Sequence, residues 1–240
     1  GSVQGIFAFL IGASIVLTVK LWNLRKKYGY LFLAFITVNS VPFFLSIFNI
    51  GPLASFLYQG TLRNRIDYWK AAVSMFRDHP IFGVGIDRFG EFYRQYAVKN
   101  QVVQGQITDN AHNVYLQLLS TGGLILFIPF LALIFYITLK GAMGFRTQNK
   151  VIRIRIASIF GIWVSSLALN LIAVDSLGVA IWFWISGGLL LAITRDLHSD
   201  ELFDVATPDT KSQKRFESRQ RTKFTTQKNV MSFPIFNLVS

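Results

Sequence analysis

The 240-residue sequence contains no cysteine and few acidic residues. The absence of cysteine excludes a disulfide scaffold and any thiolate metal site. Only 12 Asp and Glu residues stand against 24 Lys and Arg residues, and charged residues make up 15% of the chain. A soluble domain carries about a quarter charged residues, so this shortage indicates a protein of the lipid bilayer. A hydrophobic content of 52% and a mean hydropathy of +0.44 support the same class.

Several motifs of metal and nucleophile sites are also missing. The sequence has no D-x-D, no H-E-x-x-H, no Walker A loop and no G-x-S-x-G. A divalent-metal clamp for phosphate therefore has no obvious ligands, and an anionic leaving group would need arginines instead. We predict neither a metal site nor a cofactor.

Five apolar runs predict membrane-spanning helices, because a helix needs about 20 such residues to cross the hydrocarbon. They cover residues 3–19, 30–50 (with Pro42 as a kink), 114–139, 156–174 and 177–193. The predicted fold class is all-α, a polytopic transmembrane helix bundle with a large helical loop. Two spans lie in residues 1–50, the loop covers 51–112, three spans lie in 113–195, and 196–240 form a basic, disordered tail. No basic segment precedes the first run, so it is not a signal peptide as it stands, and we expect the natural start upstream.

The distribution of basic residues predicts the orientation of this bundle. Seventeen of the 24 Lys and Arg residues lie at 20–27, around Arg146 and in the tail. The positive-inside rule makes these three regions cytoplasmic and places the loop on the opposite side of the membrane. The net charge of +12 is then an attraction to anionic membrane lipids, and we predict no nucleic-acid partner.

Residues 63–77 of the loop predict an amphipathic helix that Pro80 and Gly83-Val84-Gly85 end. Its apolar stripe would face the membrane with Trp69 near headgroup depth; the stripe comprises Ile66, Trp69, Val73 and Phe76. Arg63 has Asp67 four residues on, whereas Arg65 has no acid three or four residues away. Arg65 is therefore either solvated or available to bind an anion, and spacing alone leaves both interpretations open.

His112 stands where the loop enters the third span, after three plausible N-caps, Thr108, Asp109 and Asn110. The positive end of a helix disfavours imidazolium, so His112 would be neutral at pH 7 and able to accept a proton. The alternative is a polar residue that only marks a helix start. We interpret His79, in a turn, as structural. Backbone N–H groups at Gly83 and Gly85 could contact a phosphate.

Four strings in order carry a resemblance to the O-antigen ligase and O-antigen polymerase family. They are Arg65-x3-Trp69, Asp78-His79-Pro80-x2-Gly83-x-Gly85, Ala111-His112-Asn113-x2-Leu116 and Thr121-Gly122-Gly123-Leu124-Ile125. The similarity covers roughly residues 60–128, and Gly122-Gly123 alone would also fit close helix packing. The sequence departs from the family's pattern at Leu126, where glycine is frequent, which we interpret as a packing change.

The resemblance implies an inverting, metal-independent glycosyltransferase of the GT-C type, of which this chain is the C-terminal part. Such an enzyme moves a glycan from undecaprenyl pyrophosphate to an acceptor sugar hydroxyl, on lipid A core or a growing glycan. It works at the periplasmic face of the bacterial inner membrane. The resemblance assigns catalysis to His112 and Arg65, and substrate binding to Arg63, Asn113, Trp69, Gly83 and Gly85. It also implies a further arginine upstream of the loop.

Two other classes of function remain as alternatives. One is a segment of a transporter or channel in which the loop is a lid, although the spans contain almost no ionisable residue of the kind that transport pathways use. The other is a scaffold that acts through its basic tail. Ligase and polymerase share a donor and differ in acceptor, so the sequence leaves that choice open.

Overall fold

The computed structural model describes residues 3–47, 50–51, 61–97, 108–172 and 177–206. Helices and turns make up this part of the chain, which contains no strand. The chain divides into two units, Gly1–Thr194 and Arg195–Ser240. The helices discussed below pack within the first unit. The second begins inside the last helix and continues into residues 207–240, which lie outside the described residues.

Long helices dominate the first unit: α1 (Val3–Leu24), α2 (Lys26–Ile47), α7 (Val114–Gly144), α8 (Lys150–Asn170) and the part of α9 (Leu177–Ala206) that ends at Thr194. Three described stretches are long and apolar enough to cross a membrane, namely Gln4–Leu24, Val114–Gly144 and Lys150–Asn170. A shorter apolar stretch, Ala180–Arg195, lies in α9. The predicted all-α membrane fold is thus confirmed. The predicted run 30–50 lies in α2 as far as Ile47, and residues 48–49 lie outside the described residues. The total number of spans stays a prediction.

The helices extend beyond the apolar runs that predicted them. α1 continues through Lys20, α8 already begins at Lys150, and α9 continues past Arg195 to Ala206. Lys and Arg are good helix formers, so a drop in hydropathy marks where the membrane ends and not where the helix does. The prediction of a disordered tail is therefore wrong for residues 196–206, which are helical.

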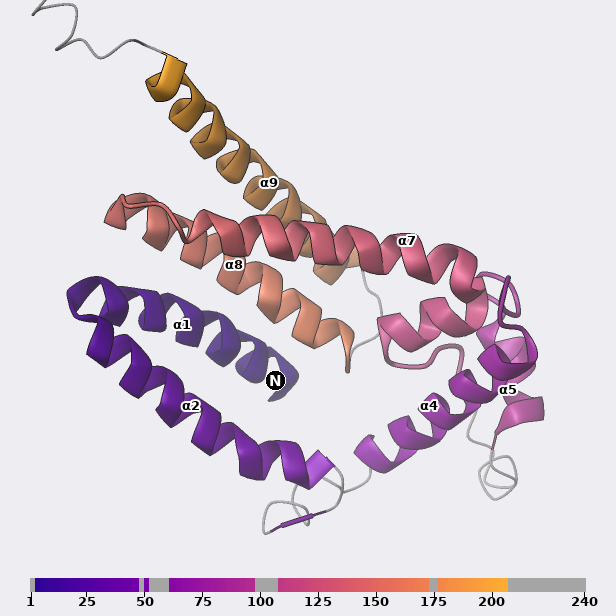
Figure 1. The fold of residues 1–240 in the computed structure, drawn as a ribbon. Helices are drawn as coiled ribbons and strands as arrows, with labels where there is room; N and C mark the ends of the chain where they lie inside the picture. Colours follow the sequence, from indigo (N-terminus) through magenta and orange to yellow (C-terminus); the bar gives the residue numbers. More distant parts are fainter. Residues whose placement is uncertain (1–2, 48–49, 52–60, 98–107, 173–176, 207–240) are drawn as a thin grey trace, which may run out of the picture. The chain divides into compact units, whose positions relative to one another are not determined.

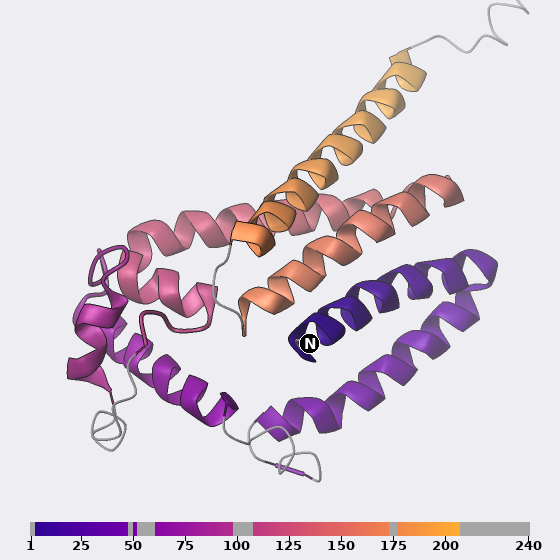
Figure 2. The same ribbon diagram turned by 180° about the vertical axis from the view of Figure 1, so that it is seen from behind.

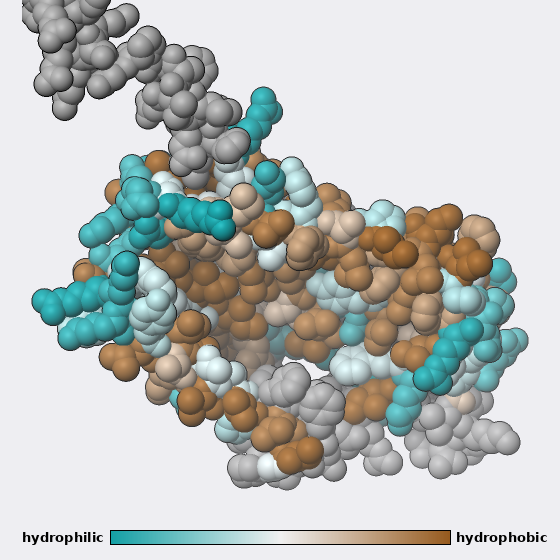
Figure 3. All heavy atoms as spheres, in the orientation of Figure 1, coloured by the Kyte–Doolittle hydropathy of each residue, from teal (hydrophilic) through white to brown (hydrophobic). Residues whose placement is uncertain are grey.

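The two basic turns of the first unit meet at one end of the helices. Asn23 of α1 donates its amide to the Lys150 carbonyl at 3.3 Å and accepts from Arg153 of α8 at 2.9 Å. Figures 1 and 2 show α1 running between α2 and α8, with the loop helices at the far end of α7. Hydrophilic residues gather near both ends, and hydrophobic ones cover the helices between them (Figure 3). This is the distribution that a membrane-spanning bundle requires.

Small residues and polar contacts hold the spans together. Gly12 of α1 lies against the backbone of Gly161 in α8, where side chains on both helices would collide. The Tyr115 hydroxyl, in the first turn of α7, donates to the Leu167 carbonyl of α8 at 3.1 Å. Close approach at glycine and hydrogen bonds between helices are the usual means of packing in hydrocarbon. The second contact fixes the start of α7, just after His112.

Candidate active site

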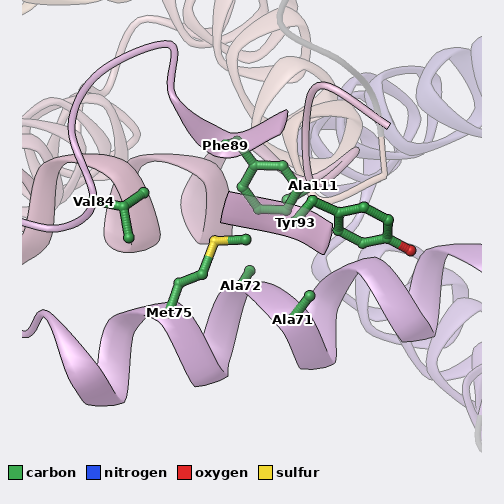
Figure 4. Packing of buried hydrophobic residues seen from close by; sticks show 7 residues of the cluster. All are labelled: Ala71, Ala72, Met75, Val84, Phe89, Tyr93 and Ala111. Atoms are coloured by element: carbon green, nitrogen blue, oxygen red, sulfur yellow. The ribbon is translucent and has the colours of Figure 1, made fainter. Parts of the chain in front are cut away.

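The loop helix α4 (Thr61–Asp78) forms where the sequence predicts it and packs on the short helix α5 (Phe89–Tyr96). Figure 4 shows Ala71, Ala72 and Met75 of α4 turned toward Phe89 and Tyr93 of α5, and all five side chains are at most 1% exposed. The two alanines permit this close approach. The predicted apolar stripe lies on another face and stays partly exposed, and its contact with lipid stays a prediction. The packing fixes α4 as a rigid support for the residues at its start.

Arg65 lies in the first half of α4 and is half-buried. With the amide carbonyl of Gln4 turned toward the guanidinium, that oxygen accepts from Nη1 at 3.0 Å and from Nη2 at 2.6 Å. Gln4 belongs to α1, so the first span reaches the loop helix. Burial lowers the pKa of Arg65 from its ordinary value, which is far above neutrality, so the group stays cationic. A neutral acceptor therefore orients the guanidinium without cancelling its charge.

His112 precedes α7 and adopts a left-handed backbone conformation, with φ of +50°. Its N–H donates to Asn110 Oδ1 at 3.0 Å, and the following residue, Asn113, caps the helix by accepting from the Leu116 N–H at 3.0 Å. The prediction of a cap among residues 108–110 is wrong, because Asn110 forms a turn before the helix. A left-handed non-glycine residue costs about 1–2 kcal/mol and is enriched at functional sites.

The His112 imidazole stacks on the ring of Tyr68, with centroids 5.6 Å apart and planes inclined by 25°. Tyr68 in turn meets Tyr93 edge-on at 5.6 Å. Burial raises the pKa of Tyr93 to about 12, with smaller contributions from Tyr68 and Asp67, so its phenol stays protonated. The imidazole is thus held against a row of aromatic rings that the α4–α5 core fixes.

Both predicted catalytic residues lie beside Tyr68, because His112 stacks on its ring and Arg65 precedes it by three residues in α4. Burial lowers the pKa of His112 below its ordinary value, and the positive charge of Arg65 lowers it further. The sequence predicted a neutral imidazole at pH 7, and the direction of this shift agrees with it. The physical causes in the structure are burial and a neighbouring cation, whereas the sequence suggested the helix end. The pair combines a proton acceptor with a fixed cation.

Gly83 and Gly85 lie where the segment before α5 packs against α7, at a point where that helix is interrupted. The Gly83 N–H donates to His79, that of Val84 to Ser120 at 2.9 Å, and that of Gly85 to Thr121 at 3.0 Å. These groups are engaged with carbonyls and are not free for a phosphate. Gly83 has φ of +66°, and a Cβ there would overlap the Thr121 backbone.

The same break explains Gly122 and Gly123. α7 is interrupted at Gly123, with φ of +60° and ψ of −166°, and the segment before α5 occupies the gap. Leu126, where the sequence departs from the family's pattern, places its side chain over Gly122. These glycines join the loop to α7, whereas the sequence alone suggested packing between helices.

The remaining predicted substrate-binding residues differ in what the structure says of them. The Arg63 side chain lies outside the described residues. Asn113 is 8% exposed, and its amide oxygen is engaged in capping α7. Trp69 follows Arg65 by one helical turn, and its Nε1 is buried without a hydrogen-bond partner among the described residues. The predicted role of Trp69 in substrate binding therefore stays a prediction.

Two residues of the site, Gln4 and Tyr68, were not predicted from the sequence. Tyr68 follows Arg65 by three residues and shares its side of the helix, so helical periodicity could have suggested it. Gln4 gives no such signal, because it stands in the first apolar run, far from α4 in the chain. Among the described residues, no group of three or more His, Asp and Glu side chains could hold a metal ion.

A comparison with known proteins identifies the family. The family model described as O-antigen ligase matches residues 1–131, which include α1, α2, both loop helices and the start of α7. No curated protein matches the chain. The match places Gln4, Arg65, Tyr68 and His112 inside the shared region. Since it covers more than half of the 240 residues, the chain belongs to the O-antigen ligase family, whose members are membrane enzymes.

Proposed function

We propose that this protein transfers a glycan from undecaprenyl pyrophosphate to a hydroxyl of an acceptor sugar, with inversion and without a metal ion. The observation that carries the proposal is that His112 stacks on Tyr68, one helical turn from Arg65, so that an imidazole with a lowered pKa shares a site with an oriented guanidinium. In the reaction, the acceptor oxygen forms a bond to the anomeric carbon while the bond from that carbon to the pyrophosphate oxygen breaks. One proton must leave the acceptor, and negative charge grows on the leaving group.

Arg65 stabilises the negative charge that develops on the leaving group. Gln4 engages the two terminal nitrogens from one side, while guanidinium has five N–H donors in total. The remaining donors can reach phosphate oxygens, and each charged hydrogen bond contributes about 1.5–3 kcal/mol. Partial burial of Arg65 strengthens such contacts because less water competes for them.

His112 accepts the proton. A sugar hydroxyl is a poor nucleophile at neutral pH, and a positioned base contributes about 10²- to 10⁴-fold to its rate of attack. The lowered pKa keeps the imidazole unprotonated, and the Tyr68 stack limits its movement. Since attack and departure occur on opposite faces of the anomeric carbon, one base and one cation are sufficient for an inverting displacement.

The site would face the periplasm of a bacterial inner membrane. The two basic turns that meet at Asn23 and Arg153 would be cytoplasmic under the positive-inside rule. The loop helices lie at the other end of α7 (Figure 1) and would then be on the outer side. Reporter tags inserted beside Trp69 and Tyr96 test this orientation, and a cytoplasmic signal from both would contradict the function as well.

Transfer of glycan to acceptor in cells that produce the protein tests the two catalytic assignments. We expect His112→Ala and Arg65→Ala each to abolish transfer while membrane insertion is unchanged. His79→Ala and Arg94→Ala are matched controls, because both residues are exposed in the same loop, and they should retain transfer. Activity in both site variants would end the assignment. Transfer that continues in the presence of a chelator is expected if no metal takes part.

The acceptor distinguishes the two forms of this reaction. A ligase attaches one glycan to a lipid A core, whereas a polymerase extends the glycan and yields a ladder of products. Supplying each acceptor separately to membranes that contain the protein, and resolving the products by length, separates the two.

A further inference from the structure

The segment between α4 and α5 exposes large apolar side chains in an otherwise polar loop. Ile81 is 59% exposed, Phe82 69% and Ile86 55%. Charged or polar residues stand on both sides, with Arg77, Asp78 and His79 before them and Asp87 and Arg88 after, and all five are exposed. Three large apolar side chains so close together are unfavourable in water, because each exposes apolar area. We call this segment loop 81–86.

Loop 81–86 is fixed against the outer part of a membrane span. The Leu124 N–H donates to the Pro80 carbonyl at 2.9 Å, and the Ile125 N–H donates to the Ile81 carbonyl at 3.2 Å. Leu124 and Ile125 begin the exposed apolar surface of α7 below the break at Gly123, where they are 38% and 54% exposed. The apolar side chains of the loop therefore continue the lipid-facing surface of the span.

The backbone of the loop is suited to a poorly hydrated position. Non-helical backbone is costly near hydrocarbon because its polar groups find no water there. Here the N–H groups of Val84 and Gly85 donate to carbonyls of α7, and the carbonyls of Ile81 and of the preceding Pro80 accept from N–H groups of α7. These four groups need no water, so their pairing lowers the cost of moving this part of the backbone toward hydrocarbon.

From these observations we infer that loop 81–86 inserts into the bilayer, with Ile81, Phe82 and Ile86 among the acyl chains of the leaflet nearest the loop. The charged residues on either side stay at the headgroups and limit the depth of insertion. The inference depends on the exposed side chains and on the pairing with α7, and holds whatever reaction the site performs. It gives the α4–α5 core a direct attachment to the membrane surface.

The chain has no cysteine, so a single introduced cysteine can carry a fluorescent label. We would label Phe82→Cys and Ile86→Cys with the environment-sensitive dye NBD, reconstitute each chain into phosphatidylethanolamine–phosphatidylglycerol vesicles, and add lipids with a doxyl quencher on the acyl chain. Glu91→Cys is the control for a solvated position, since its side chain is 64% exposed in the same loop. Ile128→Cys in α7, at 59% exposed, is the reference for a lipid-facing position.

We expect the labels at positions 82 and 86 to be quenched several-fold more strongly than the label at 91, and to approach the label at 128. Quenching at 82 and 86 no stronger than at 91 would overturn the inference. A blue-shifted emission without quenching would also overturn it, because that result means a protein surface covers the loop. Two labelled positions keep the test decisive if one substitution disturbs folding.

Discussion

Gln4 and Arg65 join the first span to the loop helix: with the Gln4 amide oxygen turned toward the guanidinium, it accepts two hydrogen bonds, of 3.0 and 2.6 Å. A carboxylate at position 4 would hold the arginine as firmly but would neutralise it. The amide orients the group and leaves its full charge for an anionic substrate and for its effect on His112. The choice of a neutral acceptor is thus a feature of the proposed chemistry, and it can be tested.

Gln4→Glu should reduce transfer and move its pH dependence. A glutamate would pair with Arg65, cancel the charge that lowers the pKa of His112, and so raise that pKa. We expect the acid limb of the rate profile to move upward in pH, and kcat/KM to fall roughly 10-fold or more as charged hydrogen bonds to the leaving group weaken. The readout is the rate of transfer as a function of pH in membranes that contain the variant.

Gln4→Leu is the matched control, because it removes the acceptor and leaves the arginine charged. Here we expect slower transfer with the acid limb in its original position. An equal profile for both variants would mean that Gln4 acts only through packing.

The wild-type protein should keep its activity below the ordinary pKa of histidine. Burial and the charge of Arg65 both disfavour imidazolium, so the folded-state pKa of His112 lies below its usual value of about 6.5. The base is therefore unprotonated through the neutral range, and activity should be lost only as the pH falls through the lowered pKa. A rate profile with its acid limb at or above pH 6.5 would contradict this role for His112.

Tyr68→Leu should lower kcat more than it raises KM, because it removes the ring that stacks on His112. Aromatic pairs contribute about 0.5–1.5 kcal/mol beyond the area they bury, so a decrease of roughly 3- to 10-fold is expected. Tyr68→Phe keeps the ring and should retain the wild-type rate. If the phenylalanine variant were as slow as the leucine variant, the hydroxyl and not the stack would be the important group. Single-turnover rates at saturating donor separate the two parameters.

Local sequence patterns were sufficient to predict α4 and the type of fold. An amphipathic period followed by Pro80 placed the helix at 63–77, and the structure has it at Thr61–Asp78. The position of the cap before α7 was not predictable in this way. Asn110 and Asn113 are equally good caps by residue type, and only the turn that Asn110 makes with the His112 N–H decides between them.

The contacts that complete the site come from residues distant in the chain, and no local pattern contains them. Gln4 lies 61 residues before Arg65 and meets it through the tertiary fold, and the segment before α5 meets α7 only because Gly123 interrupts that helix. The sequence showed the glycines but not their partners. A pair of glycines in a span fits helix packing and a helix break equally well, and the structure distinguishes the two.

The break in α7 predicts which glycines the protein needs for its stability. Gly83 and Gly123 have φ of +66° and +60°, and a Cβ at either would overlap backbone atoms of the opposite segment. Alanine at each position should lower the free energy of unfolding by about 2–4 kcal/mol, from the left-handed conformation and the overpacking together. Gly188→Ala is the matched control, because nothing lies within 4 Å of a Cβ there and alanine favours a helix. Thermal unfolding in detergent should show lower transition temperatures for the first two variants and an equal or higher one for the third. Unchanged stability in Gly123→Ala would mean that α7 runs through this point unbroken, and that the loop does not occupy a gap in it.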